Sequence, residues 1–157
     1  MYLQFAFDLH LQVRYICCMD ITIQESKMLL RKSGLKSTMT RIAVLQQIWK
    51  EERPVSHSDL VHTLKHVGDQ ATIYRNLISF VEKGLARVAS TASGIVRYEP
   101  VREGEGSHEV HPHFVCQDCG MVTCLPKSTI TTTVDPLWRE RLHKSQMQFV
   151  GVCQACD

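Results

Sequence analysis

Four cysteines near the C-terminus form two Cys-x-x-Cys pairs, Cys116 with Cys119 and Cys153 with Cys156. One pair can hold a metal ion from a single turn, and a second pair alongside it completes a tetrahedron of thiolates. Because residues 120–152 separate the pairs, a small folded domain must gather the four sulfurs. Two alternatives fit the cysteines less well. A thioredoxin-like redox motif needs only one Cys-x-x-Cys pair, and an extracellular disulfide framework needs an even number of cysteines, whereas this chain has seven. The spacing therefore predicts a structural zinc site.

A second group of possible ligands lies just before Cys116, where His108, His111 and His113 follow one another closely. If this segment is extended, His111 and His113 lie on one face and Cys116 on the other. One strand could then supply two different metal sites. Isolated histidines are more often surface residues, but these three lie at the end of, or directly after, a segment rich in glycine and charge, residues 100–112. We interpret that segment as a hinge and the histidines as a ligand cluster.

Charge is unevenly distributed along the chain, although the formal net charge is only +2. Residues 21–98 contain twelve Lys and Arg against six Asp and Glu, whereas residues 99–157 contain five against eight. The basic half favours an anionic partner such as nucleic acid, and the alternative is an ordinary solvated surface.

Residues 1–19 are apolar but are interrupted by Asp8, His10 and Arg14, with no basic leader and no small-residue cleavage site. This pattern predicts neither a signal peptide nor a membrane span. We interpret residues 1–20 as an N-terminal extension. Without an export signal we expect a cytoplasmic protein whose thiols stay reduced and available to metal.

In the basic half of the chain, the sequence predicts four helices followed by a β-hairpin. We expect helices over about residues 22–33, 40–53, 56–67 and 69–83, with Thr40 capping the second and a capping box of Ser56 and Asp59 opening the third. Strands are expected on either side of a turn at residues 91–94. Helices followed by a hairpin indicate a winged helix-turn-helix.

In a winged helix-turn-helix the fourth helix enters the major groove of DNA. Its first turns are expected to expose Gln70, Thr72, Tyr74, Arg75 and Asn76. Arg75 could pair with guanine through two hydrogen bonds, and Tyr74 could contact a thymine methyl group or a phosphate. The alternative is a protein-docking winged helix in which Tyr74 is simply packed.

From about residue 22 onward the chain resembles the ferric uptake regulator family of metal-sensing repressors. The matching residues are Gly34-Leu-Lys36, Thr40-Arg41, Ala71-Thr-Ile-Tyr-Arg75, His111-x-His113-x-x-Cys116-x-x-Cys119-Gly120 and Gly151-Val-Cys153-x-x-Cys156. The resemblance implies an α+β protein with a winged-helix DNA-binding domain (21–99), a hinge (100–112) and a zinc-stapled α/β dimerisation domain (113–157). It also implies a sensory metal at the hinge that closes a homodimer onto double-stranded operator DNA.

Carried over residue by residue, the resemblance implies a regulatory site near the hinge. His111 and His113 look like the family's hinge histidines, and Cys124 stands where many members have a carboxylate ligand. Glu105 lies near the place of another acidic ligand, and Pro54 replaces a histidine of the DNA-binding domain. The remaining positions could be supplied by His108, or by His57 one helical turn after Pro54.

A thiolate at Cys124 beside two imidazoles suits zinc better than iron(II) or manganese(II). Thr131 and Ser145 replace residues that build an additional site in iron-sensing members. We therefore expect a zinc-responsive repressor, similar to zinc uptake regulators, that contains structural zinc and a second divalent ion. The alternatives are an iron- or peroxide-responsive member, in which Cys124 could be a small buried hydrophobe.

An enzyme is the remote alternative, as a zinc hydrolase or deaminase. The deaminase pattern needs proline before its Cys pair and a glutamate two residues after a ligand histidine. Here Val115 precedes Cys116, and Glu109 directly follows His108. We therefore expect no enzymatic activity, no small-molecule substrate and no membrane partner.

Overall fold

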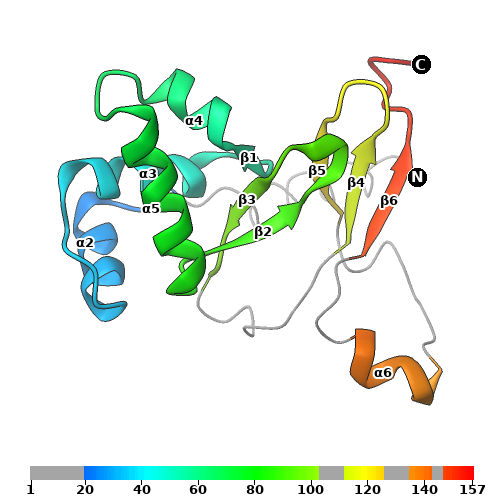
Figure 1. The fold of residues 1–157 in the computed structure, drawn as a ribbon, viewed down its shortest axis with the longest axis horizontal. Coiled ribbons are helices and arrows are strands. Elements are labelled where there is room, and N and C mark those ends of the chain that lie inside the picture. The colour runs from blue at the N-terminus through cyan, green and yellow to red at the C-terminus, as the bar shows by residue number, and fades with distance from the viewer. Residues whose placement is uncertain (1–19, 103–111, 126–134, 143–146) are drawn as a thin grey trace, which may run out of the picture.

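The structure, a computed structural model, describes residues 20–102, 112–125, 135–142 and 147–157. Helices and a three-stranded sheet form the N-terminal unit, residues 20–102, and a second three-stranded sheet with one helix forms the C-terminal unit (Figure 1). The α+β class expected from the sequence is confirmed. The N-terminal extension expected over residues 1–20 lies outside the described residues except for its last residue.

The first two helices are set by threonine caps. Helix α2 (Ile23–Lys32) begins at a capping box, in which Thr22 Oγ1 accepts from the Glu25 N–H at 3.2 Å. Helix α3 (Met39–Lys50) begins at Thr38, whose hydroxyl accepts from the Arg41 N–H. The expectation that Thr40 is this cap was wrong, because Thr38 has the extended backbone that a cap needs, whereas the Thr40 hydroxyl donates to Val67 O at 3.1 Å.

Helices α4 (His57–Thr63) and α5 (Gln70–Glu82) pack against each other. The expected capping box of Ser56 and Asp59 opens α4, and Asp69 caps α5. Helix α4 ends four residues earlier than expected, because the chain turns at residues 64–68 to approach α3. A Cβ at Gly68 would lie 2.7 Å from Thr40 Cγ2, so this approach requires glycine.

The expected hairpin forms from β2 (Ala86–Ser90) and β3 (Arg97–Pro100), joined by a turn that contains η1 (Ala92–Gly94). A short strand that the sequence did not indicate, β1 (Val55–Ser56), adds to the other edge of β3. The hairpin follows α5 and forms the wing of a winged helix. Helices and sheet share one core, whose fully buried members include Leu30, Ile42, Val44, Leu45, Ile48, Leu60, Ile73, Leu77 and Phe80.

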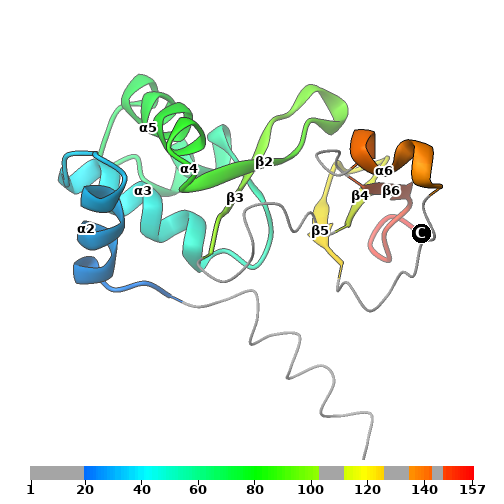
Figure 2. The ribbon, with the colours of Figure 1, turned by 90° about the horizontal axis from the view of Figure 1, so that it is seen from below.

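The second sheet is built around β4 (His113–Cys116). Strand β5 (Val122–Cys124) pairs with it in antiparallel orientation and β6 (Gln148–Gly151) in parallel orientation. Helix α6 (Pro136–Leu142) lies beyond the strand ends (Figure 1). In both views the β2–β3 hairpin lies between the helices and this sheet (Figure 2). Among the described helices, none has the length and apolar character needed to cross a membrane.

Candidate metal centres and DNA-binding face

The two Cys-x-x-Cys turns meet at the C-terminal ends of β4 and β6 in the second sheet. Because β4 and β6 are parallel with Cys116 opposite Gly151, the turns that follow them emerge side by side. The four sulfurs all lie within 4.8 Å of one another, and the sulfurs of Cys119 and Cys153 are 3.8 Å apart. A tetrahedral zinc site with bonds of about 2.3 Å has sulfur–sulfur edges of about 3.8 Å. The donor set therefore fits a tetrahedral metal ion.

The electrostatics of this cluster also fit a cation. The backbone N–H of Cys119 is the main cause that lowers the pKa of Cys116 to about 6, against the opposing effect of burial. Hydrogen bonding to Cys153 and then Cys119 raises the pKa of Cys156 to about 12. Four neighbouring thiols therefore do not all ionise by themselves, and a divalent cation supplies the charge that four thiolates need.

A second cluster joins the two units of the chain. Glu99 on β3 meets His113 on β4 and Cys124 on β5, with one donor atom from each within 4.8 Å of the others. Glu99 Oε2 lies 3.1 Å from His113 Nε2, and the Cys124 thiol donates to the same oxygen at 3.5 Å. Glu99 and His113 are buried. Oxygen, nitrogen and sulfur donors facing one point fit a divalent transition metal.

Local structure explains how these three donors meet. His113 and Cys124 are direct partners in the antiparallel β4–β5 register, and Glu99 extends from the wing strand. Glu99 was missed by sequence reasoning. The available signal was weak: an acidic residue within a predicted strand, next to Tyr98, which is also buried. A buried carboxylate needs a partner, but the sequence does not say which distant residue supplies it.

Of the other expected regulatory ligands, Glu105, His108 and His111 lie outside the described residues. On β4, His113 joins the Glu99 cluster and Cys116 joins the four-cysteine cluster, so one strand contributes to both clusters. His57 belongs to neither. Its Nε2 lies 3.0 Å from Gln70 O, and its ring meets the edge of Tyr74 at a centroid distance of 5.6 Å. The structure thus places His57 against α5.

Helix α5 presents part of the expected DNA-binding set. Gln70 and Arg75 are exposed and Tyr74 is 49% exposed, while the half-buried Thr72 donates its hydroxyl to the cap Asp69 at 2.6 Å. The expectation that Asn76 is exposed was wrong. It is buried, and its side-chain oxygen accepts from Arg41 Nε at 3.0 Å. Asn76 lies one turn after the half-buried Thr72, on the side of α5 that faces Arg41 of α3.

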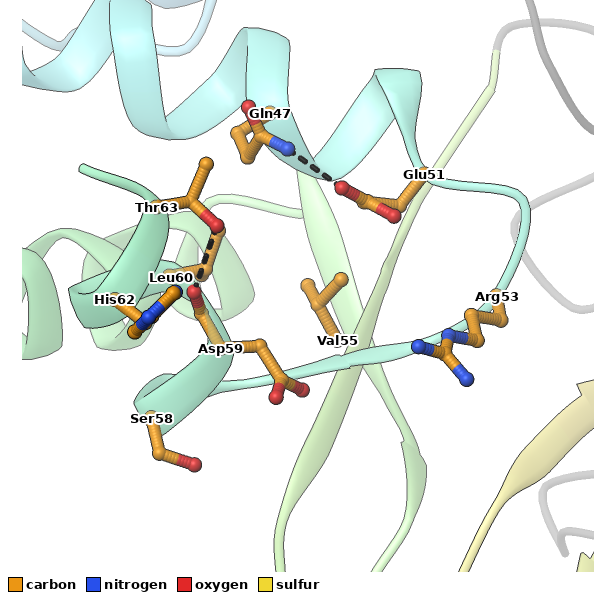
Figure 3. Close-up of a pocket in the computed structure, with 9 residues that line it drawn as sticks. All are labelled: Gln47, Glu51, Arg53, Val55, Ser58, Asp59, Leu60, His62 and Thr63. Carbon is orange, nitrogen blue, oxygen red and sulfur yellow. Dashed lines mark hydrogen bonds between the residues drawn. The ribbon is translucent and has the colours of Figure 1, made fainter.

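A shallow hollow of about 290 Å³ lies between α3, β1 and α4 (Figure 3). Its polar groups pair with one another: Gln47 donates to Glu51 at 2.6 Å, and Thr63 donates to Asp59 O. Burial raises the pKa of Asp59, but hydrogen bonds from Ser56 outweigh this effect and hold the pKa below its ordinary value. This hollow shows no converging donor set for a ligand.

The model of the ferric uptake regulator family matches residues 32–150, a range that includes α5, the Glu99, His113 and Cys124 cluster and the first of the two Cys-x-x-Cys pairs. The chain belongs to the ferric uptake regulator family. Members of this family are metal-responsive transcriptional regulators that bind DNA as dimers, and they are not enzymes. The expected family is therefore confirmed, together with the expectation that the protein is not an enzyme.

Curated relatives carry the same family name. The ferric uptake regulation protein of Pseudomonas aeruginosa is 33% identical over 116 residues, which cover 71% of this chain and 83% of the relative. That of Campylobacter jejuni is 25% identical over 146 residues, covering 88% of this chain and 90% of the relative.

Solved structures of ferric uptake regulators share the fold. The Pseudomonas aeruginosa regulator with manganese has a TM-score of 0.62 at 29% identity, covering 82% of this chain and 98% of that one. A zinc uptake regulator complexed with zinc and DNA has a TM-score of 0.56 at 17% identity, covering 85% of this chain and 91% of that one. The second likeness, at this low identity, concerns the fold alone.

Proposed function

We propose that this protein is a cytoplasmic, zinc-responsive repressor that binds operator DNA as a homodimer. The observation that carries the proposal is the cluster of Glu99, His113 and Cys124, because it joins the wing strand of the N-terminal unit to the sheet of the C-terminal unit. The four-cysteine cluster is proposed as a separate structural zinc site. Residues 21–99 are proposed as the DNA-binding domain and residues 113–157 as the dimerisation domain.

The donors explain how an ion could control the arrangement of the units. A divalent cation bound at this cluster supplies the positive charge that holds the Glu99 carboxylate beside the Cys124 thiolate. Glu99, on the wing strand, is then fixed to His113 and Cys124, so the DNA-binding unit keeps one orientation. A dimer with both units oriented in this way presents two copies of α5 at a set spacing.

Zinc is favoured because a thiolate and an imidazole supply two of the three donors, and soft ligands select zinc over iron(II) and manganese(II). Iron(II) is the second candidate. The observations that favour it are the carboxylate oxygen of Glu99 and the ferric uptake names of the curated relatives.

Exposed apolar side chains on the C-terminal unit support the proposed dimerisation face. Val150 on β6 is 67% exposed, and Leu137 and Trp138 on α6 are 84% and 53% exposed. Apolar side chains so exposed on a small unit are typical of an interaction surface. We propose that the partner protomer covers them.

The test is a metal titration of DNA binding. The protein, loaded with structural zinc, is titrated with buffered zinc, iron(II) or manganese(II), and fluorescence anisotropy follows its binding to a duplex selected from a random library. We expect zinc to stimulate binding at the lowest free concentration. His113→Ala should abolish the stimulation while one zinc per chain remains. Stimulation by iron(II) or manganese(II) at lower free concentrations than zinc would overturn the zinc assignment.

A further inference from the structure

The two oxygens of the Glu99 carboxylate have different surroundings. Arg87 Nε donates to Oε1 at 2.6 Å, whereas Oε2 faces His113 Nε2 and the Cys124 thiol. Arg87 and Glu99 are direct cross-strand partners in the β2–β3 register, so the hairpin itself holds the ion pair in place. The carboxylate is buried, with its side chain only 6% exposed, so solvent screens this ion pair weakly.

The hydrogen bond from Arg87 limits how the Glu99 carboxylate can coordinate an ion. A short hydrogen bond between two charged groups is stronger than a neutral one and has a defined direction. While Oε1 accepts from Arg87, Glu99 offers one oxygen to an ion at the cluster instead of two. Outer partners of this kind set the orientation of a ligand and tune the affinity of a site.

We propose that Arg87 is a specificity-determining residue of the Glu99, His113 and Cys124 site. Arg87 does not touch the ion; it is a positioning residue that restricts Glu99 to a single oxygen donor. The resulting set of one oxygen, one nitrogen and one sulfur suits the low coordination number of zinc. It disfavours manganese(II) and iron(II), which accept oxygen-rich shells of higher coordination number. This inference rests on the proposed metal site.

Arg87 also explains how the Glu99 carboxylate can be buried when no metal is bound. A buried carboxylate without a cation nearby carries a large desolvation cost. The Arg87 guanidinium compensates the charge of Glu99 before an ion arrives, so the wing strand can carry this ligand in the metal-free protein. Its positive charge at the same time opposes the approach of any divalent cation. Arg87 therefore makes the site both more selective and weaker.

The test measures metal affinities at this site in full-length protein that already contains structural zinc. Dissociation constants for zinc and manganese(II) are obtained by competition with a chromophoric chelator, for the wild type and for Arg87→Met. We expect both ions to bind more tightly to the variant, with manganese(II) gaining more. The ratio of the manganese(II) to the zinc dissociation constant should fall about tenfold, the size typical of outer-shell changes.

Cobalt(II) gives a second readout that a merely structural role would not move. Four-coordinate cobalt(II) absorbs visible light far more strongly than six-coordinate cobalt(II). In protein with structural zinc in place, we expect strong absorption for the wild type and weaker absorption for Arg87→Met, because the second oxygen of Glu99 becomes available.

Arg31→Met is the matched control, since it removes the same charge from an exposed position on α2. It should leave the ratio and the cobalt(II) spectrum unchanged. Arg87→Gln gives a second test if the methionine variant does not fold, and it should lower the ratio in the same direction. An unchanged ratio in a folded Arg87 variant that binds metal would overturn the inference and leave the proposed function standing. Wild-type protein with no second metal site would instead overturn the proposed function.

Discussion

Cys124 is the side chain that would supply the soft donor of the proposed regulatory cluster, which consists of Glu99, His113 and Cys124. It lies opposite His113 in the β4–β5 register, and its thiol points at the carboxylate oxygen that faces the same histidine. It is half-buried. The preference for zinc in the proposed function depends on this sulfur.

Cys124→Asp is expected to keep a metal site but to weaken its preference for zinc. A hard oxygen replaces a soft sulfur, so the ratio of manganese(II) to zinc dissociation constants should fall by about tenfold or more. Chelator competition measures both constants, and metal analysis checks that one structural zinc per chain remains. If the ratio is the same as in the wild type, Cys124 is not a ligand.

Arg75 is the exposed basic side chain near the start of α5, so Arg75→Ala should weaken DNA binding. The expected loss is roughly 1–3 kcal/mol if the guanidinium pairs with a base edge. Anisotropy at moderate salt measures the affinity, and sedimentation checks that the dimer is intact. Lys83→Ala, at the other end of the helix, is the matched control and should have little effect. Equal effects of the two changes would indicate a general contribution of charge.

At the scale of elements, β3 serves both units of the chain. Its alternate residues face opposite sides, so Tyr98 enters the core of the N-terminal unit while Arg97 and Glu99 face the C-terminal unit. Arg97 Nη2 donates to Gly120 O at 3.0 Å, in the turn that carries Cys119, and its Nη1 lies 3.5 Å from Asp59. The strand therefore contacts the surroundings of both metal clusters.

Arg97→Met should separate metal binding from the DNA response. The ligands Glu99, His113 and Cys124 remain, so zinc affinity at the regulatory cluster should stay within about twofold. DNA affinity at saturating zinc should fall about tenfold, a coupling energy of ordinary size, because the turn and α4 lose their link. The two titrations are run on the same preparation. Unchanged DNA affinity would show that this link does not contribute to the response.

At the scale of the whole molecule, one small sheet organises the C-terminal unit. Strand β4 supplies His113 to one cluster and Cys116 to the other, and β6 brings in the second pair of cysteines. The described part of this unit offers a small apolar core, mainly Val115 and Val122, beside exposed apolar side chains. A unit of this size gains stability from a metal and from a partner protomer.

Cys153→Ser should release the structural zinc and lower the stability of the dimer. The reason is that the free energy of metal binding contributes to the folding free energy of such a small unit. Metal analysis should show one zinc fewer per chain, and analytical ultracentrifugation should show dissociation at micromolar concentration. Cys124→Ser is the control, since it should retain the structural zinc and the dimer. A zinc-free Cys153→Ser dimer with wild-type thermal stability would contradict the structural role.

Features set by neighbouring residues could be predicted from the sequence. The predicted capping box of α4 involves residues three apart, and each Cys-x-x-Cys pair lies within a single turn. The apolar faces of the helices repeat with the helical period. For these features the interacting atoms belong to one short segment, so local physical chemistry determines them.

Other features depended on contacts that only the folded chain creates. Glu99 meets His113 and Cys124 across 14 and 25 positions of sequence, and Arg41 reaches Asn76 across 35. Sequence patterns do not indicate how a strand of one unit lies against a sheet of the other, so Glu99 was missed. They also do not indicate how α5 packs against α3, so Asn76 was expected at the surface. The sequence by itself determined which residues could bind metal and which helix could read DNA. Only the tertiary structure decided which of the distant donors share one site, because burial and the relative placement of strands bring them together.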